Sequence, residues 1–127
     1  MKTVNKYLIA ATVAFFPFAA PMAASAADQF GAIAYSQQSQ HYGWSVNMNS
    51  QNEAETAAMN QCYNYGSDCK DIWFSNACGA LAIGSDGGWG MNWGENSTQA
   101  ENKAIAQCNN VSKDCKVEFT KCTDNVH

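Results

Sequence analysis

The sequence predicts an α+β domain built from two ββαβ repeats, which form a small antiparallel-sheet domain with two helices, stapled by three disulfides. Three observations predict this fold class: a secretory start, six cysteines in a short chain and an internal duplication. The duplication is clearest in QCYNYGSDCK and QCNNVSKDCK, in which a Gln-Cys pair is followed seven residues later by the cysteine of an Asp-Cys-Lys triplet.

Residues 1–26 have the layout of a secretory signal peptide. Two lysines precede an apolar stretch that ends near Ala20, and small residues ending in A-S-A follow. The apolar stretch is too short for a typical membrane-spanning helix, so a retained membrane anchor is the weaker alternative. We therefore expect a mature domain at residues 27–127, secreted or periplasmic, with no membrane span after the signal is removed.

The mature domain is acidic, with five lysines, no arginine and eleven carboxylates. Nucleic-acid binding requires clustered Lys and Arg side chains to contact phosphates, so this composition argues against a nucleic-acid partner. A basic protein is the natural electrostatic complement of such a surface.

All six cysteines lie in the mature domain, at Cys62, Cys69, Cys78, Cys108, Cys115 and Cys122. An even number of cysteines in a small secreted domain is typical of a disulfide framework. A zinc site would favour C-x(2–4)-C spacing and a redox site C-x-x-C, whereas the recurring spacing here is C-x6-C. We expect three disulfides, no free thiol, no metal site and no cofactor.

The two halves of the mature chain align in order, as GAIAY with GALAI and GWSVNM with GWGMNW, followed by an Ala-rich segment and the paired cysteines. Repeat one covers about residues 30–78 and repeat two about residues 79–122, with Cys78 at the seam. The alignment covers nearly the whole mature chain and therefore predicts a single duplicated domain.

Each repeat is expected to open with a β-hairpin. Residues 31–36 and 42–48 alternate in side-chain character with period two, as strands with one buried face do. In repeat two, Ser85-Asp86-Gly87-Gly88 is a strong signal for the hairpin turn.

A helix and a third strand follow in each repeat. Ser50 and Glu53 form a capping box, and Asn96 and Gln99 stand at the equivalent place. Small side chains then recur at helical spacing, at Ala54, Ala57, Ala58 and Cys62, and at Ala100, Ala104 and Cys108. They would let each helix lie close to a sheet. The segments CKDIWFS and CKVEFTK predict the third strand.

The duplication suggests a symmetric disulfide pairing. Each C-x6-C pair would join the end of a helix to the start of the next strand, giving 62–69 and 108–115. The remaining pair, 78–122, would tie repeat to repeat, because each of its cysteines follows the third strand of its copy. Six cysteines allow fifteen pairings, so this connectivity is a hypothesis from symmetry.

Seven segments, taken in order, resemble the bacterial secreted proteins of the domain of unknown function 4189 family: FGAIAYS, YGWS, EAETAAMNQC, DCK, WFSNACGALAIG, WGMNWG and QAENKAIAQC. The resemblance runs from about Phe30 to Cys122. It implies a secreted, disulfide-tied α+β domain without established catalytic activity, and it supplies no catalytic residues.

The carboxylates and histidines form no recognisable catalytic set. Glu53 is accounted for by the capping box, and we expect Glu55 and Glu101 at equivalent positions on a solvated helix face. His41 has no Ser or free Cys nucleophile at a recognisable spacing. The sequence therefore predicts a protein that is not an enzyme. A small cell-wall hydrolase is the alternative, which a tight pair of carboxylates in a cleft would favour.

The aromatic residues are candidates for the core and for a binding surface. One strand face is predicted to carry Tyr42, Trp44, Val46 and Met48, and its counterpart Trp89, Met91 and Trp93. The repeat alignment pairs Trp44 with Trp89 and Met48 with Trp93. Four tryptophans exceed what so small a core needs, so some are expected at the surface, where flat rings bind proteins or sugars. The expected binding residues are Trp93, Trp44, Tyr42, His41 and Asp86.

We therefore expect a secreted or periplasmic, non-enzymatic protein-binding module. An inhibitor or immunity protein against a wall hydrolase or toxin fits this description, as does a host-facing secreted factor. Besides the hydrolase, the alternative is a glycan-binding module that uses exposed tryptophans.

Overall fold

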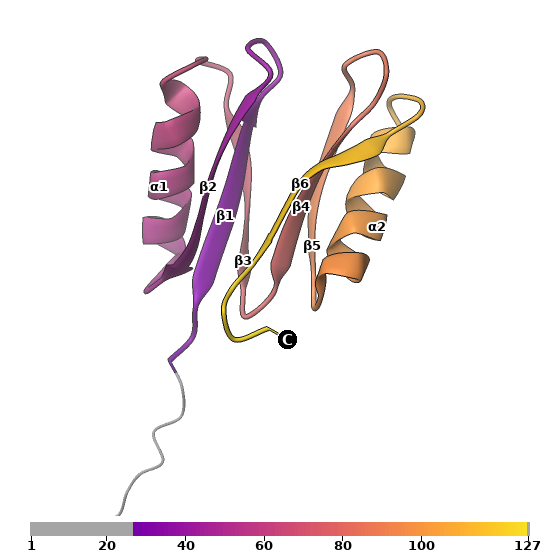
Figure 1. The fold of residues 1–127 in the computed structure, drawn as a ribbon. Helices are drawn as coiled ribbons and strands as arrows, with labels where there is room; N and C mark the ends of the chain where they lie inside the picture. Colours follow the sequence, from indigo (N-terminus) through magenta and orange to yellow (C-terminus); the bar gives the residue numbers. More distant parts are fainter. Residues whose placement is uncertain (1–26, 127) are drawn as a thin grey trace, which may run out of the picture.

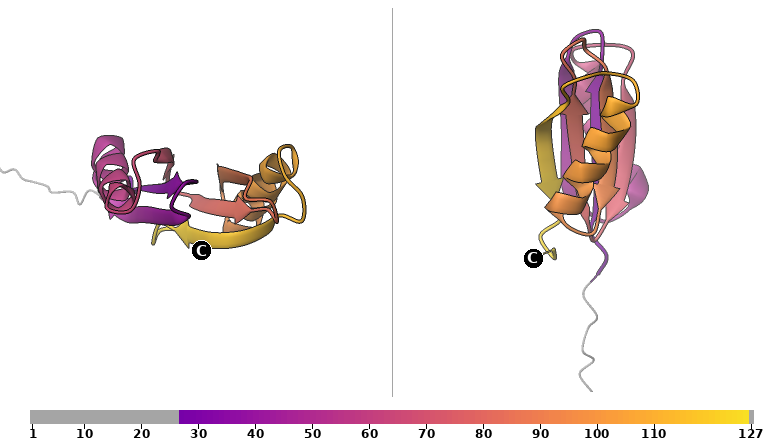
Figure 2. Two further views of the ribbon diagram at one scale, coloured as in Figure 1. Left: turned by 90° about the horizontal axis from the view of Figure 1, so that it is seen from above. Right: turned by 90° about the vertical axis from the view of Figure 1, so that its right-hand side faces the viewer.

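Two three-stranded antiparallel sheets pack face to face, and one helix covers the outer face of each sheet (Figures 1 and 2). The structure is a computed structural model that describes residues 27–126, so the predicted signal peptide lies outside the described residues. In chain order the elements are β1 (Phe30–Ser36), β2 (His41–Met48), α1 (Gln51–Tyr63), β3 (Lys70–Ser75), β4 (Cys78–Ile83), β5 (Trp89–Gly94), α2 (Ser97–Asn109) and β6 (Lys116–Cys122).

Each repeat builds one sheet and one helix in ββαβ order, which confirms the predicted fold class. The strand order is β2-β1-β3 in the first sheet and β5-β4-β6 in the second, and all neighbouring strands are antiparallel. The first strand of each hairpin is therefore central. We call the whole arrangement of helix, two sheets and helix the sandwich.

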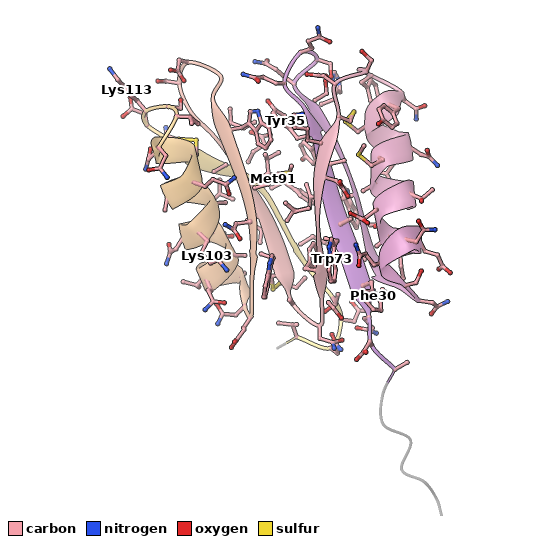
Figure 3. All side chains as sticks on the ribbon, turned by 180° about the vertical axis from the view of Figure 1, so that it is seen from behind. Phe30, Tyr35, Trp73, Met91, Lys103 and Lys113 are labelled. Atoms are coloured by element: carbon pink, nitrogen blue, oxygen red, sulfur yellow. A yellow bond between two sulfur atoms is a disulfide. The ribbon has the colours of Figure 1, made fainter. Side chains whose placement is uncertain are left out.

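Each central strand packs against the other sheet with one face and against its helix with the other face. In β1, Ile33 and Tyr35 pack between the sheets, whereas Ala32 and Ala34 pack against α1. The strand β4 repeats this division, with Leu81 between the sheets and two alanines against α2. Figure 3 shows Tyr35 and Met91 in the space between the sheets. The alternation of GAIAY and GALAI thus separates a large-residue core from two alanine-lined helix contacts.

Small residues bring each helix close to its sheet, as the sequence predicts. The side chains of Ala54, Ala58 and Cys62 in α1 are fully buried, and so are their counterparts in α2, Ala100, Ala104 and Cys108. Both predicted caps are present. The backbone N–H of Glu53 donates to Ser50 Oγ at 3.1 Å, and that of Gln99 donates to Asn96 Oδ1 at 2.9 Å.

Glycines complete this close approach. A side chain on Gly43 in β2 would run into the backbone carbonyl of Ala58, and one on Gly90 in β5 would meet the carbonyl of Ala104. Gly43 and Gly90 therefore occupy the same place in the two repeats.

The strand register corrects the predicted pairing of residues between the repeats. Trp44 lies opposite Ile33, whereas its true counterpart Met91 lies opposite Leu81. Trp89 corresponds to Tyr42, so the prediction that Trp44 and Trp89 are equivalent is wrong by two positions. The letters GW occur in both hairpins, but the second hairpin has the shorter turn, and only the contact of each strand with its helix fixes the register.

A β-bulge corrects the predicted face of Met48. The pairing of β1 with β2 shifts between Ala32 and Phe30, and Asn47 adopts a left-handed conformation with φ of 62°. The extra residue turns Met48 to the other side of the sheet, where it packs with Phe30 against the alanines between β1 and α1.

The six cysteines form the three predicted disulfides: Cys62–Cys69, Cys108–Cys115 and Cys78–Cys122. The role expected for the third bond is wrong. Cys78 is the first residue of β4 and lies directly opposite Cys122 of β6, so this bond joins two strands of the second sheet rather than the two repeats. The repeats are held together by packing across the sandwich instead.

Candidate binding site

Two exposed tryptophans from different repeats line one pocket at the edge of the sandwich. The side chains of Trp73 on β3 and Trp93 on β5 are 41% and 46% exposed, respectively. Together with Phe74 and Ser75 they line a pocket of about 270 Å³. The strands β3 and β5 are edge strands of their sheets and are in contact across the sandwich, so the pocket lies where the repeats meet.

The alternation of β3 places Trp73 at this surface. Ile72 and Phe74 point between the sheets, and the Phe74 ring packs against the backbone of Gly31 and of Gly79, one from each sheet. Trp73 must then face the α1 side, where its ring lies 6.3 Å from that of Phe30 (Figure 3). Because β3 is an edge strand, α1 leaves this ring partly uncovered.

Trp93 is held at the pocket by the neighbouring helix. The ammonium group of Lys103 on α2 lies 4.6 Å from the centre of the Trp93 ring, a cation–π contact. The side chain of Asn92 also accepts a hydrogen bond from the backbone N–H of Trp93. Trp93 is among the binding residues expected from the sequence and Trp73 is not, although the alternation of WFS places Trp73 opposite the core face.

The other two aromatic candidates, Trp44 and Tyr42, lie at the opposite edge of the sandwich. Both are half-buried against Phe119 of β6, at ring distances of 5.6 Å and 4.8 Å. The ammonium group of Lys121 lies 4.9 Å from the centre of the Trp44 ring. These residues close the β2–β6 edge and do not join Trp93.

The polar candidates His41 and Asp86 also lie apart from the tryptophan pocket. The exposed His41 ring stacks on Tyr65, with centroids 4.1 Å apart, and its Nδ1 is 2.9 Å from the carbonyl oxygen of Ser39. Asp86 lies in the β4–β5 turn, where its carboxylate accepts hydrogen bonds from the hydroxyl of Ser112 and the N–H of Gly88. These bonds lower the pKa of Asp86 and give it a structural role.

The first repeat contains a matching link with the partners exchanged. The hydroxyl of Ser36, at the end of β1, donates to the carboxylate of Asp68 in the loop before β3, and the N–H of Gln38 donates to the same carboxylate. The Ser36 hydrogen bond is the main cause of the lowered pKa of Asp68. In both repeats a serine–aspartate pair therefore joins the hairpin turn to the disulfide loop.

A carboxyl pair joins α1 to β3. Asp71 is half-buried beside Glu55, and its buried Oδ2 has no hydrogen-bond donor unless one of the two carboxyls carries a proton. Burial, together with the adjacent Glu55 carboxyl, raises the pKa of Asp71 to about 6. Glu101, the counterpart of Glu55, is also half-buried and accepts a hydrogen bond from Thr120 Oγ1 at 2.7 Å. The expectation that Glu55 and Glu101 are solvated is wrong, because both turn toward the third strand of their repeat.

The core contains one further perturbed group. The hydroxyl of Tyr35 is buried without a hydrogen-bond partner, and burial raises its pKa. No three His, Cys, Asp or Glu side chains of residues 27–126 are placed to hold a metal ion. Over the same range no helix is long and apolar enough to cross a membrane.

The fold and this site define a class of protein: a small duplicated α+β sandwich with three disulfides and an aromatic pocket at the junction of its repeats. The chain belongs to the DUF4189 family, described as a domain of unknown function, whose family model matches residues 30–122. This match confirms the resemblance that the sequence motifs indicate.

A solved structure shares the fold. The NMR structure of Rv1813c from Mycobacterium tuberculosis matches with a TM-score of 0.60 and 21% sequence identity, over 91% of this chain and 99% of that chain. At this identity the likeness concerns the fold alone. A comparison with curated proteins finds no match at a significant level.

Proposed function

We propose that the chain is a secreted or periplasmic protein-binding module that acts without catalysis, and that the Trp73–Trp93 pocket is its contact site. The observation that carries this proposal is the convergence of two exposed tryptophans, one from each repeat, on a single pocket. Tryptophan is enriched at the energetic centres of protein interfaces, because its large rigid ring buries much apolar surface at low entropic cost.

The charge of the domain favours a basic partner. It carries five lysines and eleven carboxylates, and two of the lysines already lie over tryptophan rings. A partner that presents an apolar side chain flanked by Lys or Arg would fit both the pocket and the surface potential. A toxin or wall hydrolase held inactive by this domain, or a host protein met after secretion, would need to carry such a surface.

The three disulfides support a location outside the cytoplasm. All six cysteines are paired, and such bonds persist in the periplasm or the medium rather than in a reducing cytosol. The signal-peptide pattern of residues 1–26 points to the same compartments.

Capture of partners from periplasmic extract and culture medium by the immobilised mature domain tests the proposal. We expect a specific protein that Trp73→Ala and Trp93→Ala each release at least tenfold more readily. Tyr63→Ala is the matched control, because Tyr63 is 51% exposed on α1 and lies outside the pocket. Association should also slow as salt rises, since screening acts beyond about 8–10 Å. Binding that neither tryptophan variant weakens would contradict the proposal.

The carboxyl pair favours a small cell-wall hydrolase as the second candidate, since a carboxyl with a pKa near 6 is suited to general acid catalysis. The spacing argues against it. Hydrogen-bonded carboxyl oxygens lie roughly 2.5–3 Å apart, whereas glycosidases separate their carboxyls by about 5 Å or more. Neither Glu55 nor Asp71 lines the tryptophan pocket. Wall lysis by the purified domain that Asp71→Asn or Glu55→Gln abolishes would favour the hydrolase.

A further inference from the structure

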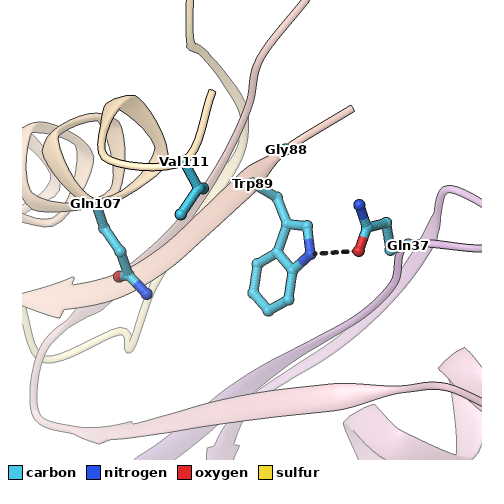
Figure 4. Close-up of a pocket in the computed structure, with 5 residues that line it drawn as sticks. All are labelled: Gln37, Gly88, Trp89, Gln107 and Val111. Atoms are coloured by element: carbon cyan, nitrogen blue, oxygen red, sulfur yellow. Dashed lines mark hydrogen bonds between the residues drawn. The ribbon is translucent and has the colours of Figure 1, made fainter. Parts of the chain in front are cut away.

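A second pocket, of about 420 Å³, lies at the hairpin end of the sandwich (Figure 4). Its lining residues are Gln37 from the β1–β2 turn and, from repeat two, Gly88, Trp89, Gln107 and Val111. This size falls in the roughly 300–1,000 Å³ range of small-molecule sites. Trp89 of this pocket and Trp93 of the first pocket lie near opposite ends of β5, roughly 13 Å apart along the strand. The two pockets are therefore separate sites.

The equivalent place in repeat one is filled by side chains. His41 corresponds to Gly88 because each directly precedes one of the counterparts Tyr42 and Trp89. Tyr65 corresponds to Val111, since the N–H of each donates to the carbonyl of the last cysteine of its helix. The rings of His41 and Tyr65 stack with an interplanar angle of 5°. Gly88 has no side chain, although Ser112 closes the space where its Cβ would stand, and Val111 is short and 66% exposed. Repeat two therefore has no stacked pair of rings at these positions, and its opening lies beside Val111 and Trp89.

A glutamine amide in repeat two also lacks the backbone hydrogen bonds that its counterpart makes in repeat one. In repeat one, Gln61 uses its whole amide on the backbone of Trp44, accepting from its N–H at 3.0 Å and donating to its carbonyl at 2.8 Å. The counterpart, Gln107, does not clamp its strand in this way, and its Oε1 accepts from Asn92 Nδ2 at 3.3 Å. Its amide nitrogen points toward Trp89 (Figure 4).

The Trp89 ring is fixed beside these amides. Its Nε1–H donates to Gln37 Oε1 at 3.4 Å, and its ring makes an edge contact with Tyr35 at a centroid distance of 5.6 Å. Gln37 in turn donates from Nε2 to the carbonyl of Gly87 at 3.4 Å. The pocket therefore combines a rigid apolar surface with two amide groups, one from each repeat, of which that of Gln37 is held at both ends and that of Gln107 at its oxygen.

We propose that this pocket binds one ring of a neutral sugar. A pyranose has an apolar face of C–H groups that stacks on an indole, and a rim of hydroxyls that donate and accept hydrogen bonds. Glutamine amides offer the complementary donors and acceptors. None of the lining residues carries a charge, which favours an uncharged ligand over a phosphate or carboxylate. A purely apolar ligand would cover the Gln107 amide nitrogen without offering it an acceptor, at a cost of about 1–3 kcal/mol.

An NMR titration of the mature domain tests this site, with the indole N–H resonance of Trp89 as the probe signal. Cellotriose, maltotriose and chitotriose are the neutral sugars, and adenosine is a flat, uncharged ligand that is not an oligosaccharide. We expect at least one trisaccharide to shift the resonance saturably, with a Kd of about 1 mM or lower. Adenosine should leave it unchanged.

Two variants locate the binding. Val111→Tyr restores the bulk that repeat one has at this exposed position, and Gln107→Leu removes the amide; each should weaken sugar binding at least tenfold. Trp93→Ala, in the other pocket, should leave it unaltered. The sugar proposal is overturned by a flat titration with all three sugars, by a stronger response to adenosine, or by sugar binding that Val111→Tyr does not alter. Loss of protein binding in Trp93→Ala with sugar binding intact would separate the two sites.

Discussion

The side chains of Glu55 and Asp71 lie together between α1 and β3, where a proton on one carboxyl gives the buried Oδ2 of Asp71 the hydrogen-bond partner that it otherwise lacks. Asp71 is protonated more easily in the folded chain than in the unfolded chain, in which its pKa is near 3.8. The folded state therefore binds more protons between these two pKa values, and the free energy of unfolding falls as the pH rises from about 4 to about 6.

Asp71→Asn should remove this pH dependence. We expect the wild-type domain to lose about 1 kcal/mol of stability across that window, after allowance for solvent screening of a half-buried group, and the variant to lose less. Urea unfolding at several pH values measures the difference. Glu118→Gln, at an exposed carboxylate of β6, is the control and should keep the wild-type slope. A slope that Asp71→Asn leaves unchanged would mean that the carboxyls do not share a proton.

The 78–122 disulfide should be the most stabilising of the three bonds. It closes a loop of 44 residues, whereas each helix-end bond closes seven. The loop-entropy model gives about 4 kcal/mol for the long loop and about 2.5 kcal/mol for a short one. Paired Cys→Ser variants of 78 and 122 and of 62 and 69, unfolded in urea, test the order. Thiol labelling of the denatured, unreduced protein should find no reactive cysteine.

The tryptophans of the two edges should differ in their effect on stability. Trp44→Ala removes a half-buried ring packed on Phe119 and should cost about 2–4 kcal/mol. Trp93→Ala removes a largely exposed ring and should cost about 1 kcal/mol or less. Thermal unfolding of both variants measures the difference. An equal loss in the two variants would show that Trp93 is part of the core and would move the search for a partner to the loops around His41 and Asp86.

The glycines under the helices should not accept a side chain. Gly43→Ala and Gly90→Ala each place a methyl group against helix backbone, which cannot move aside cheaply, so we expect a loss of about 3 kcal/mol or more. Gly87→Ala is the matched control. Gly87 has open space around it but a φ of 89°, so only backbone strain of about 1–2 kcal/mol applies. Urea unfolding that ranks Gly87→Ala as the worst of the three would contradict the close helix contact.

Local features of the fold could be predicted from the sequence, and long-range ones could not. The caps at Ser50 and Asn96 and the alanine stripes depend on neighbours a few residues away, so local spacing is sufficient to predict them. The register of the hairpins depends on a bulge at Asn47 and on turn length, which the repeated letters GW conceal.

The candidate site could not be predicted from the sequence, because it forms where one repeat packs on the other. The duplicated pattern did not indicate that Phe119 would cover Trp44, because these residues come from different repeats. The same packing brings Trp73 beside Trp93. Alternation along WFS was enough to turn Trp73 away from the core, but the sequence did not show that β3 would be an edge strand next to β5.

The serine–aspartate links carry a consequence for how the two repeats have diverged. In repeat one Ser36 presses against Gly66, and at the corresponding positions of repeat two Gly84 lies against Ser112. The hydroxyl has changed sides, and the glycine has changed sides with it. Each copy therefore keeps its own compensated pair, and a residue taken singly from the other copy produces a collision or a hole. Ancestral reconstruction and repeat-swapping experiments on this chain must exchange such positions two at a time.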